Sequence, residues 1–171
     1  QELADALNAE LKSLKVHELY VGMKPESSAG KTQFKLTLQL PGGGSPAAIL
    51  SEGEQRAIAI AAFLAEIKLS KSRGGIIFDD PVTSLDNDRK KQIAERLAFQ
   101  ATLKQVIIFT HDLVFFYHIK NFSKKFLNGI NDSFAHHSLE RESQLCGKVV
   151  ANTSPANEGQ YHEPTKAESW L

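Results

Sequence analysis

Apolar side chains recur every three or four residues in several stretches of the chain, and this spacing predicts helices. Residues 1–15 have leucines at this interval and contain neither glycine nor proline. Residues 51–69 add many alanines to the same spacing, so other elements can approach this helix closely and we expect it to be largely buried. Shorter helices are predicted at about 87–102 and from the residue after His111 to about 121.

Three other stretches have the patterns of strands. Residues 33–40 alternate between apolar and polar side chains, as in a strand with one buried face. Residues 75–78 and 105–109 are apolar without alternation, which is typical of central strands in a parallel sheet covered on both faces. Because a helix is predicted between them, they form a βαβ unit with a right-handed crossover. The chain is therefore expected to be an α/β protein with a mainly parallel sheet flanked by helices.

The two ends of the chain have weaker patterns. The helix at 1–15 has two interpretations that remain open: an amphipathic helix packed on its own domain, or the end of a coiled coil, which would need three or more heptads. Two short strands are expected around Cys146-Gly147. Pro, Asn, Gly and Glu dominate the C-terminus, so we expect a main lobe at 33–150 and a loop or mobile tail at 151–171.

Composition narrows the classes of function. The chain has 171 residues, enough for one core, and its 20 acidic and 20 basic residues produce no strong field that would favour nucleic acid or a membrane. The cluster of Lys120, Lys124 and Lys125 is better explained as a solvated helix face. One cysteine fits a reducing compartment, and no export signal or membrane-spanning run is seen, so we expect a cytoplasmic protein without a membrane partner.

Polar residues follow both apolar strands. The first strand runs into Asp79-Asp80 and the second into Thr110-His111. The carboxyl ends of parallel strands lie at one edge of the sheet, where open α/β sheets bind ligands. An apolar strand ending in aspartate is typical of a Walker B motif, whose first carboxylate holds Mg²⁺ while a second can orient an attacking water. Taken alone, the two aspartates are a weak signal and are more often exposed turn residues, here before Pro81.

The predicted helix at 51–69 has a strong start signal. Ser51 can cap it, and Glu54 stands three residues later, as in a capping box. The first amides of a helix have no internal partner, and the helix dipole adds partial positive charge there. Gly53 lets the backbone approach an anion closely, so this helix start is suited to binding phosphate.

Four motifs occur in a meaningful order: LSEGE, IIFD, SLD and THD, at 50–54, 76–79, 84–86 and 110–112. In this order they resemble the signature, Walker B, D-loop and switch histidine of ABC-type ATPase heads, especially the SMC/RecF/RecN-like branch. The wording LSEGEQ…FDDPVTSLD…FTHD is most similar to RloC- and PrrC-like ATPases. The resemblance covers about 34–115 and implies a partial P-loop NTPase (ABC ATPase) fold whose N-terminal Walker A lobe is absent.

The resemblance implies a site in which two heads enclose ATP and Mg²⁺. Asp79 matches the Mg²⁺ ligand, Asp80 the water-positioning carboxylate and His111 the residue that senses the γ-phosphate. Many members have glycine where this chain has Glu52, and glutamate where it has Asp80, which is one methylene shorter. The positions implied to bind ATP, the signature acting in trans, are Ser51, Glu52, Gly53, Glu54, Ser84 and Asp86.

The stretch SSAGKT at 27–32 resembles the end of a phosphate-binding loop, but its surroundings argue against that function. Pro25 stands where the first glycine is needed, and Thr32 leads into a predicted strand, whereas a P-loop leads into a helix. We interpret this stretch as a turn. The expected partners are therefore the chain's own N-terminal Walker A lobe and a second head, in a homodimer.

Two other functions fit the motifs less well than an ATPase head. A transporter's nucleotide-binding subunit is disfavoured by LSEGEQ and Asp80, and a non-catalytic nucleotide-sensing module by the intact Asp79, Asp80 and His111. A role in DNA repair, genome maintenance or phage defence, including control of a nuclease, rests on the resemblance alone, as does any nucleic-acid partner. His136, His137 and Cys146 could suggest a zinc site, but no fourth ligand stands at a suitable spacing.

Overall fold

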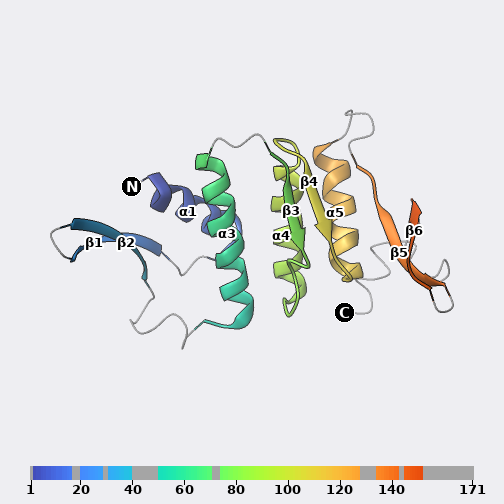
Figure 1. Cartoon of the computed structure of the whole chain (residues 1–171), viewed down its shortest axis with the longest axis horizontal. Helices are drawn as coiled ribbons and strands as arrows, with labels where there is room; N and C mark the ends of the chain where they lie inside the picture. The colour runs from blue at the N-terminus through green and yellow to red at the C-terminus, as the bar shows by residue number, and fades with distance from the viewer. Residues whose placement is uncertain are drawn as a thin grey trace.

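The computed structural model describes residues 2–16, 20–28, 31–39, 50–70, 74–127, 134–142 and 145–151. Helices and strands follow one another as the sequence predicts, with one additional strand near the N-terminus (Figure 1). In chain order, the elements are α1 (Glu2–Ser13), β1 (Tyr20–Ser28), β2 (Lys31–Gln39), α3 (Glu52–Ser70), β3 (Ile76–Asp79), α4 (Asn87–Gln100), β4 (Val106–Phe109), α5 (Leu113–Phe126), β5 (His137–Glu142) and β6 (Leu145–Ala151).

The core joins α1 and α3 to β3 and α4. Leu7, Leu11 and Leu14 are buried in this cluster, and α1 packs directly on α3. The leucine spacing at the N-terminus thus serves packing within the chain's own domain. The continuation of α1 into a coiled coil stays a prediction.

Helix α3 is less buried than its sequence predicts. Its buried residues form one face, from Ala57 to Ala65, whereas Ala59 is exposed and Phe63 is 40% exposed. Phe63 still contacts Phe78 of β3 edge-to-face, with ring centroids 5.6 Å apart. The alanines allow close packing on any side of a helix, but in the described residues the packing takes place on one side.

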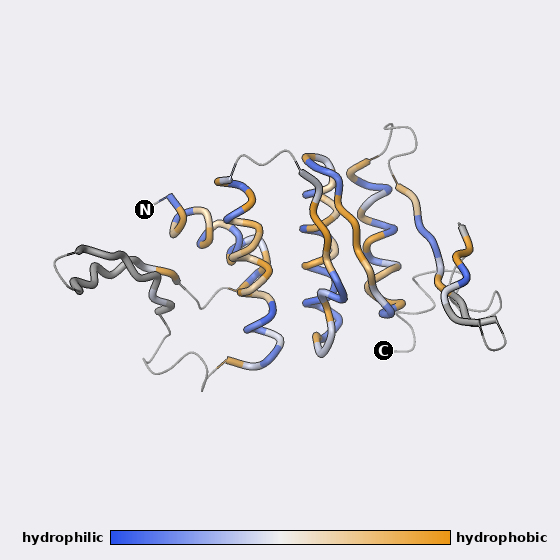
Figure 2. Tube along the Cα trace, viewed as in Figure 1, coloured by the Kyte–Doolittle hydropathy of each residue, from blue (hydrophilic) through white to orange (hydrophobic). Residues whose placement is uncertain are grey.

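Strands β3 and β4 are parallel, as predicted, with Ile76 opposite Val106 and Asp79 opposite Phe109. The expectation that both of their faces are covered is wrong. Ile76 and Phe78 of β3 are buried, but the residues that alternate with them face outward. Ile77 of β3 is 62% exposed, and Phe109 of β4 is 52% exposed. Helices α4 and α5 lie behind the two strands in Figure 1, and Figure 2 shows hydrophobic residues along most of both strands. One apolar face of this sheet is therefore uncovered within the described residues.

The SSAGKT stretch spans an antiparallel hairpin. Ser27 pairs with Thr32 and Ser28 with Lys31, so β2 begins two residues earlier than predicted, and the β1 strand was not predicted at all. Lys31 starts a strand, so the helix that a P-loop requires does not follow it. Ser27, Ser28, Lys31 and Thr32 lie in paired strands, and the predicted turn itself, at 29–30, lies outside the described residues.

The predicted strands around Cys146-Gly147 are confirmed as the antiparallel pair β5–β6. Its register shifts between Glu140 and Arg141, and Gly147 opposite has a φ of 90°. This is the left-handed conformation that glycine adopts readily in a β-bulge. The predicted tail at 151–171 lies outside the described residues except for Ala151, the last residue of β6, and α5 runs five residues beyond its predicted end at 121.

Candidate functional site

The polar residues after β3 and β4 lie side by side, as the sequence predicts. Asp79 is the last residue of β3 and pairs with Phe109, the last of β4. The next amide along, that of Asp80, donates a hydrogen bond of 2.8 Å to the Phe109 carbonyl. Asp80 therefore leaves the sheet beside the loop that carries His111.

Both carboxylate oxygens of Asp80 are held. Oδ2 lies 2.9 Å from Nδ1 of His111 and accepts a hydrogen bond of 2.6 Å from the Thr83 hydroxyl. Oδ1 accepts a longer bond of 3.3 Å from the Thr110 hydroxyl. The backbone of Asp80 has a φ of 44°, a left-handed conformation that aspartate tolerates better than most residues. This combination fixes a carboxylate at the sheet edge, with the side chain of His111 80% exposed in front of it.

Asp79 is more exposed than Asp80. It lies on the exposed side of β3, because Ile76 and Phe78 take the buried positions of the alternating strand. A single exposed carboxylate suits Mg²⁺, which commonly keeps several waters and shares the oxygens of a bound phosphate group. No cluster of three or more His, Cys, Asp or Glu side chains suited to a metal is found in the part of the chain that the structure describes. The exposed carboxylate of Asp79 fits a metal that is also held by a bound phosphate group.

The start of α3 has the predicted capping box. The amide and hydroxyl of Ser51 donate to Oε2 of Glu54, at 2.9 and 2.8 Å, and the Glu54 amide donates back to the Ser51 hydroxyl at 3.3 Å. These bonds from Ser51, with a smaller contribution from Arg89, lower the pKa of Glu54 below its usual value. The carboxylate of Glu54 thus orders the helix start, and Glu52, by contrast, is exposed and 3.8 Å from Arg56.

Gly53 brings this helix start close to the SLD motif. A Cβ atom at Gly53 would lie 2.9 Å from Cδ2 of Leu85, closer than real Cβ contacts allow. A side chain at position 53 would therefore require the Leu85 side chain to shift, independently of any phosphate.

The two polar residues of the SLD motif, Ser84 and Asp86, lie in different local environments. Ser84 is exposed and has a φ of 65°. Asp86 caps α4, its Oδ1 accepting a hydrogen bond of 2.8 Å from the Arg89 amide. Asp86 thus has a local function at the start of α4, and its expected contact across a dimer interface stays a prediction.

Several residues around this site were not predicted. Arg56 donates from Nη1 to the Asp80 carbonyl at 3.3 Å and so links α3 to the end of β3. Thr83 and Thr110 hold the Asp80 carboxylate. Arg56 stands one helical turn after Glu52, a spacing that indicates an ion pair on the helix but gives no sign of the contact with Asp80.

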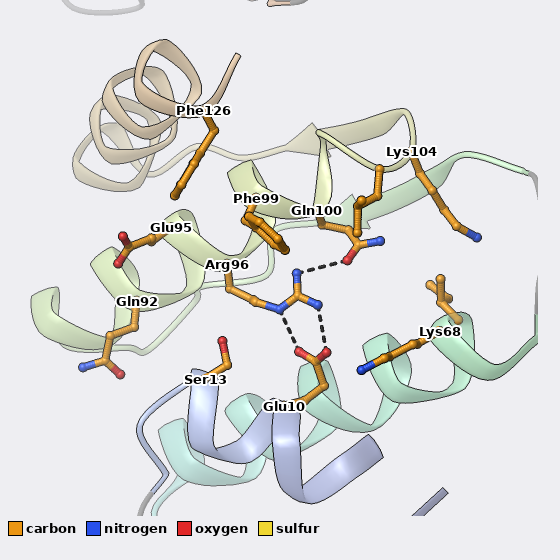
Figure 3. A pocket seen from close by; sticks show the side chains of 12 residues that line it. Glu10, Ser13, Lys68, Gln92, Glu95, Arg96, Phe99, Gln100, Lys104 and Phe126 are labelled. Atoms are coloured by element: carbon orange, nitrogen blue, oxygen red, sulfur yellow. Dashed lines mark hydrogen bonds and ion pairs between the residues drawn. The ribbon is translucent and has the colours of Figure 1, made fainter. Parts of the chain in front are cut away.

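A cavity of about 560 Å³ lies elsewhere, between α1, α3 and the C-terminal half of α4 (Figure 3). Glu10 of α1 accepts two hydrogen bonds from Arg96 of α4, at 2.7 and 2.8 Å, and Arg96 also donates to Gln100 at 3.0 Å. The side chains of this ion pair are only 6% and 10% exposed. We interpret this ion pair as a contact that holds α1 to α4, because the charges of Glu10 and Arg96 neutralise each other.

Breaking this ion pair should destabilise the fold. Glu10→Gln keeps the size of the side chain but leaves the Arg96 charge buried and unpaired, which should lower the free energy of unfolding by about 3 kcal/mol. Glu66→Gln, on the exposed side of α3, is the matched control and should change it by less than about 0.5 kcal/mol. Urea unfolding followed by circular dichroism measures both, and equal effects would contradict the assignment.

Comparison with protein-family models identifies the family of this chain. The family model for AAA_13, an AAA domain, matches residues 1–158. The chain belongs to this family. A search of curated proteins found no match to this AAA_13 chain. Within the described residues, no helix is long and apolar enough to cross a membrane.

Solved structures show which fold the AAA_13 chain has. One from a study of ATP-driven dimerization and DNA-stimulated activation of SMC ATPases has a TM-score of 0.64 at 15% identity, covering 99% of this chain and 88% of that one. An Smc head bound to the C-terminal domain of ScpA from Pyrococcus furiosus has a TM-score of 0.54 at 17% identity, with 68% and 30% covered. An Smc head bound to the C-winged helix domain of ScpA has 0.51 at 18%, with 64% and 34% covered. The chain thus has the α/β P-loop NTPase fold of SMC ATPase heads.

Proposed function

We propose that this AAA_13 chain is the C-terminal half of an ATP-binding and ATP-hydrolysing head that dimerises around ATP. One observation carries the proposal: a fixed carboxylate at Asp80, contacted by His111, stands beside the exposed carboxylate of Asp79 at the carboxyl edge of two parallel strands. Two carboxylates placed in this way can hold Mg²⁺ and orient an attacking water, which are two of the tasks of the protein in phosphoryl transfer.

Each residue has a separate task in this function. Asp79 would hold Mg²⁺, which when bound neutralises charge on the phosphates. Asp80 would accept a hydrogen bond from the attacking water and hold it in line with the γ-phosphate. His111 is exposed enough to reach the γ-phosphate while its Nδ1 stays beside Asp80.

The start of α3 would act on the ATP of the second head. Ser51 and the first amides of α3 form a helix N-terminus that is exposed to solvent, and such an end binds anions. The Ser51 hydroxyl donates to Glu54, so contact with a phosphate would require it to turn away from that carboxylate. Glu52, exposed beside it, would lie at the rim of this contact, with Ser84 and Asp86 on the adjoining loop.

A further segment carrying a P-loop would complete the site. The uncovered face of β3–β4, with Ile77, Ile107 and Phe109 exposed, supports this, because apolar parallel strands are normally covered on both faces. Among the described strands, β3 and β4 pair only with each other, so their outer edges are open for further strands. We propose the Walker A lobe as the segment that covers this face.

Lys31 should take no part in ATP binding. It begins β2 opposite Ser28, where no helix dipole faces a phosphate. Lys31→Ala in the complete head should therefore leave the dissociation constant for ATP within about twofold, measured with a fluorescent ATP analogue. A loss of Mg²⁺-dependent binding in this variant alone would make SSAGKT a phosphate-binding loop after all.

The biological process is proposed from the resemblance of the motifs. Their wording is most similar to that of RloC- and PrrC-like ATPases, and one structurally similar SMC ATPase is described as stimulated by DNA. We propose that the head drives a nucleic-acid-directed process, such as DNA repair or phage defence, and controls a nuclease there.

Dimerisation tests the proposed function directly. The complete head should be monomeric without nucleotide and dimeric with ATP and Mg²⁺, as measured by light scattering. A head that stays monomeric with ATP, at concentrations that saturate its binding, would contradict the proposal.

A further inference from the structure

The first turn of α4 lies between the two parts of the site that would act on different ATP molecules. This turn begins at Asp86, which caps it, and continues through Arg89 and Lys90. These two neighbouring cations extend to opposite partners, Glu54 at the start of α3 and Asp112 beyond His111. Neither partner was expected from the sequence, since each lies far from α4 along the chain.

Arg89 is connected to Ser51 through Glu54. Its Nη2 lies 3.9 Å from Oε1 of Glu54, whose other oxygen, Oε2, accepts both hydrogen bonds from Ser51. The Arg89 side chain is only 22% exposed, and its Nη1 is buried without a hydrogen-bond partner among the described residues. The guanidinium is thus packed between α4 and α3, where its charge attracts the Glu54 carboxylate that accepts both hydrogen bonds from Ser51.

Leu85 adds an apolar contact to this connection. It lies against Gly53, two residues from Ser51, so closely that a side chain there would displace it. The signature residues therefore rest on the loop and first turn of α4 through one charged and one apolar contact.

Lys90 is connected to His111 through Asp112. Its Nζ lies 2.7 Å from Oδ2 of Asp112, and the two side chains are 16% and 19% exposed. The other carboxylate oxygen of Asp112 caps α5 by accepting a hydrogen bond of 2.8 Å from the Phe115 amide. The backbone amide of Asp112 donates a hydrogen bond of 3.1 Å to the Thr110 hydroxyl. His111 stands between two residues that are held in this way, so the ion pair sets the position of its backbone.

We propose that Arg89 and Lys90 are positioning residues that join the trans-acting signature to the cis-acting histidine through one rigid helical turn. The inference rests on the proposed function, in which Ser51 acts on the second head's ATP and His111 on the chain's own. Because Asp86 of the D-loop caps the same turn, displacement of that loop on dimerisation would move both connections together.

Two charge-removing variants of the complete head separate the two connections. Arg89→Gln should weaken ATP-dependent dimerisation at least about fivefold, because the Glu54 carboxylate that binds Ser51 loses its ion-pair partner. Lys90→Gln should leave dimerisation within about twofold but lower kcat about tenfold or more, because a small displacement of a group at the reacting centre has a large effect on rate. The dimer dissociation constant is measured by light scattering and kcat by phosphate release.

Lys91→Gln is the matched control, since Lys91 is the exposed neighbour on the same helix and loses the same charge. It should change neither quantity by more than about twofold. Arg89→Lys and Lys90→Arg keep the charge and should recover part of each loss, and they replace the glutamine variants if melting curves show that those are unfolded.

The outcomes distinguish the inference from the proposed function. If the glutamine variants behave like Lys91→Gln, or if both lower the two quantities by the same factor, the inference is wrong while the ATPase head stands. If the unaltered head forms no ATP-dependent dimer, the proposed function fails first.

Discussion

Asp80→Asn in the complete head should lower the rate of ATP hydrolysis by about 10²- to 10⁴-fold, the usual contribution of a general base. The amide cannot take a proton from the attacking water. It can still accept one hydrogen bond and donate another within the network of Thr83, Thr110 and His111. Asparagine also tolerates the φ of 44° at this position, so the fold should be preserved.

ATP-dependent dimerisation should survive this change, because Asp79 and the start of α3 are untouched. Phosphate release measures turnover and light scattering measures the dimer. Asp88→Asn, an exposed aspartate in the first turn of α4, is the control and should hydrolyse ATP at the unaltered rate. Unchanged turnover in Asp80→Asn would remove Asp80 from the mechanism, and loss of the dimer as well would indicate a structural role only.

Ser51→Asp should weaken ATP-dependent dimerisation by about a hundredfold or more. Aspartate can accept the hydrogen bond from the Glu54 amide as serine does, but its carboxylate would also lie beside Oε2 of Glu54, so circular dichroism must first show that α3 is retained. Its negative charge would face the γ-phosphate of the second head's ATP, and opposed like charges across an interface cost several kcal/mol. Ser51→Asn has the same shape without the charge and is the control, which should dimerise within about tenfold of the unaltered head.

Mixing the two variants tests whether the signature acts in trans. A mixed dimer of Ser51→Asp and Asp80→Asn heads contains one composite site in which both Ser51 and Asp80 are intact. If the signature acts on the second head, ATP hydrolysis should therefore rise well above that of either variant alone. No rise in a mixture that forms dimers would show that Ser51 and Asp80 serve the same ATP.

The sequence by itself determined the features that depend on residues close together along the chain. The capping box needs only the spacing of Ser51 and Glu54, and hydrogen bonds confirm it. The strand after SSAGKT excluded a P-loop for the same local reason. The juxtaposition of Asp80 and His111 was predictable because parallel strands on either side of a helix end at one sheet edge.

Only the tertiary structure decided which surfaces and charges meet. Ile77 belongs to an apolar run that would suit a strand covered on both faces, but coverage depends on what packs there, and in the described residues one face is open. Glu10 and Arg96 are 86 positions apart in the chain, and Arg89 and Lys90 reach partners on two other elements. The sequence shows that such side chains are charged. Which partners they meet depends on how the helices pack, and the spacing of residues along the chain does not indicate this.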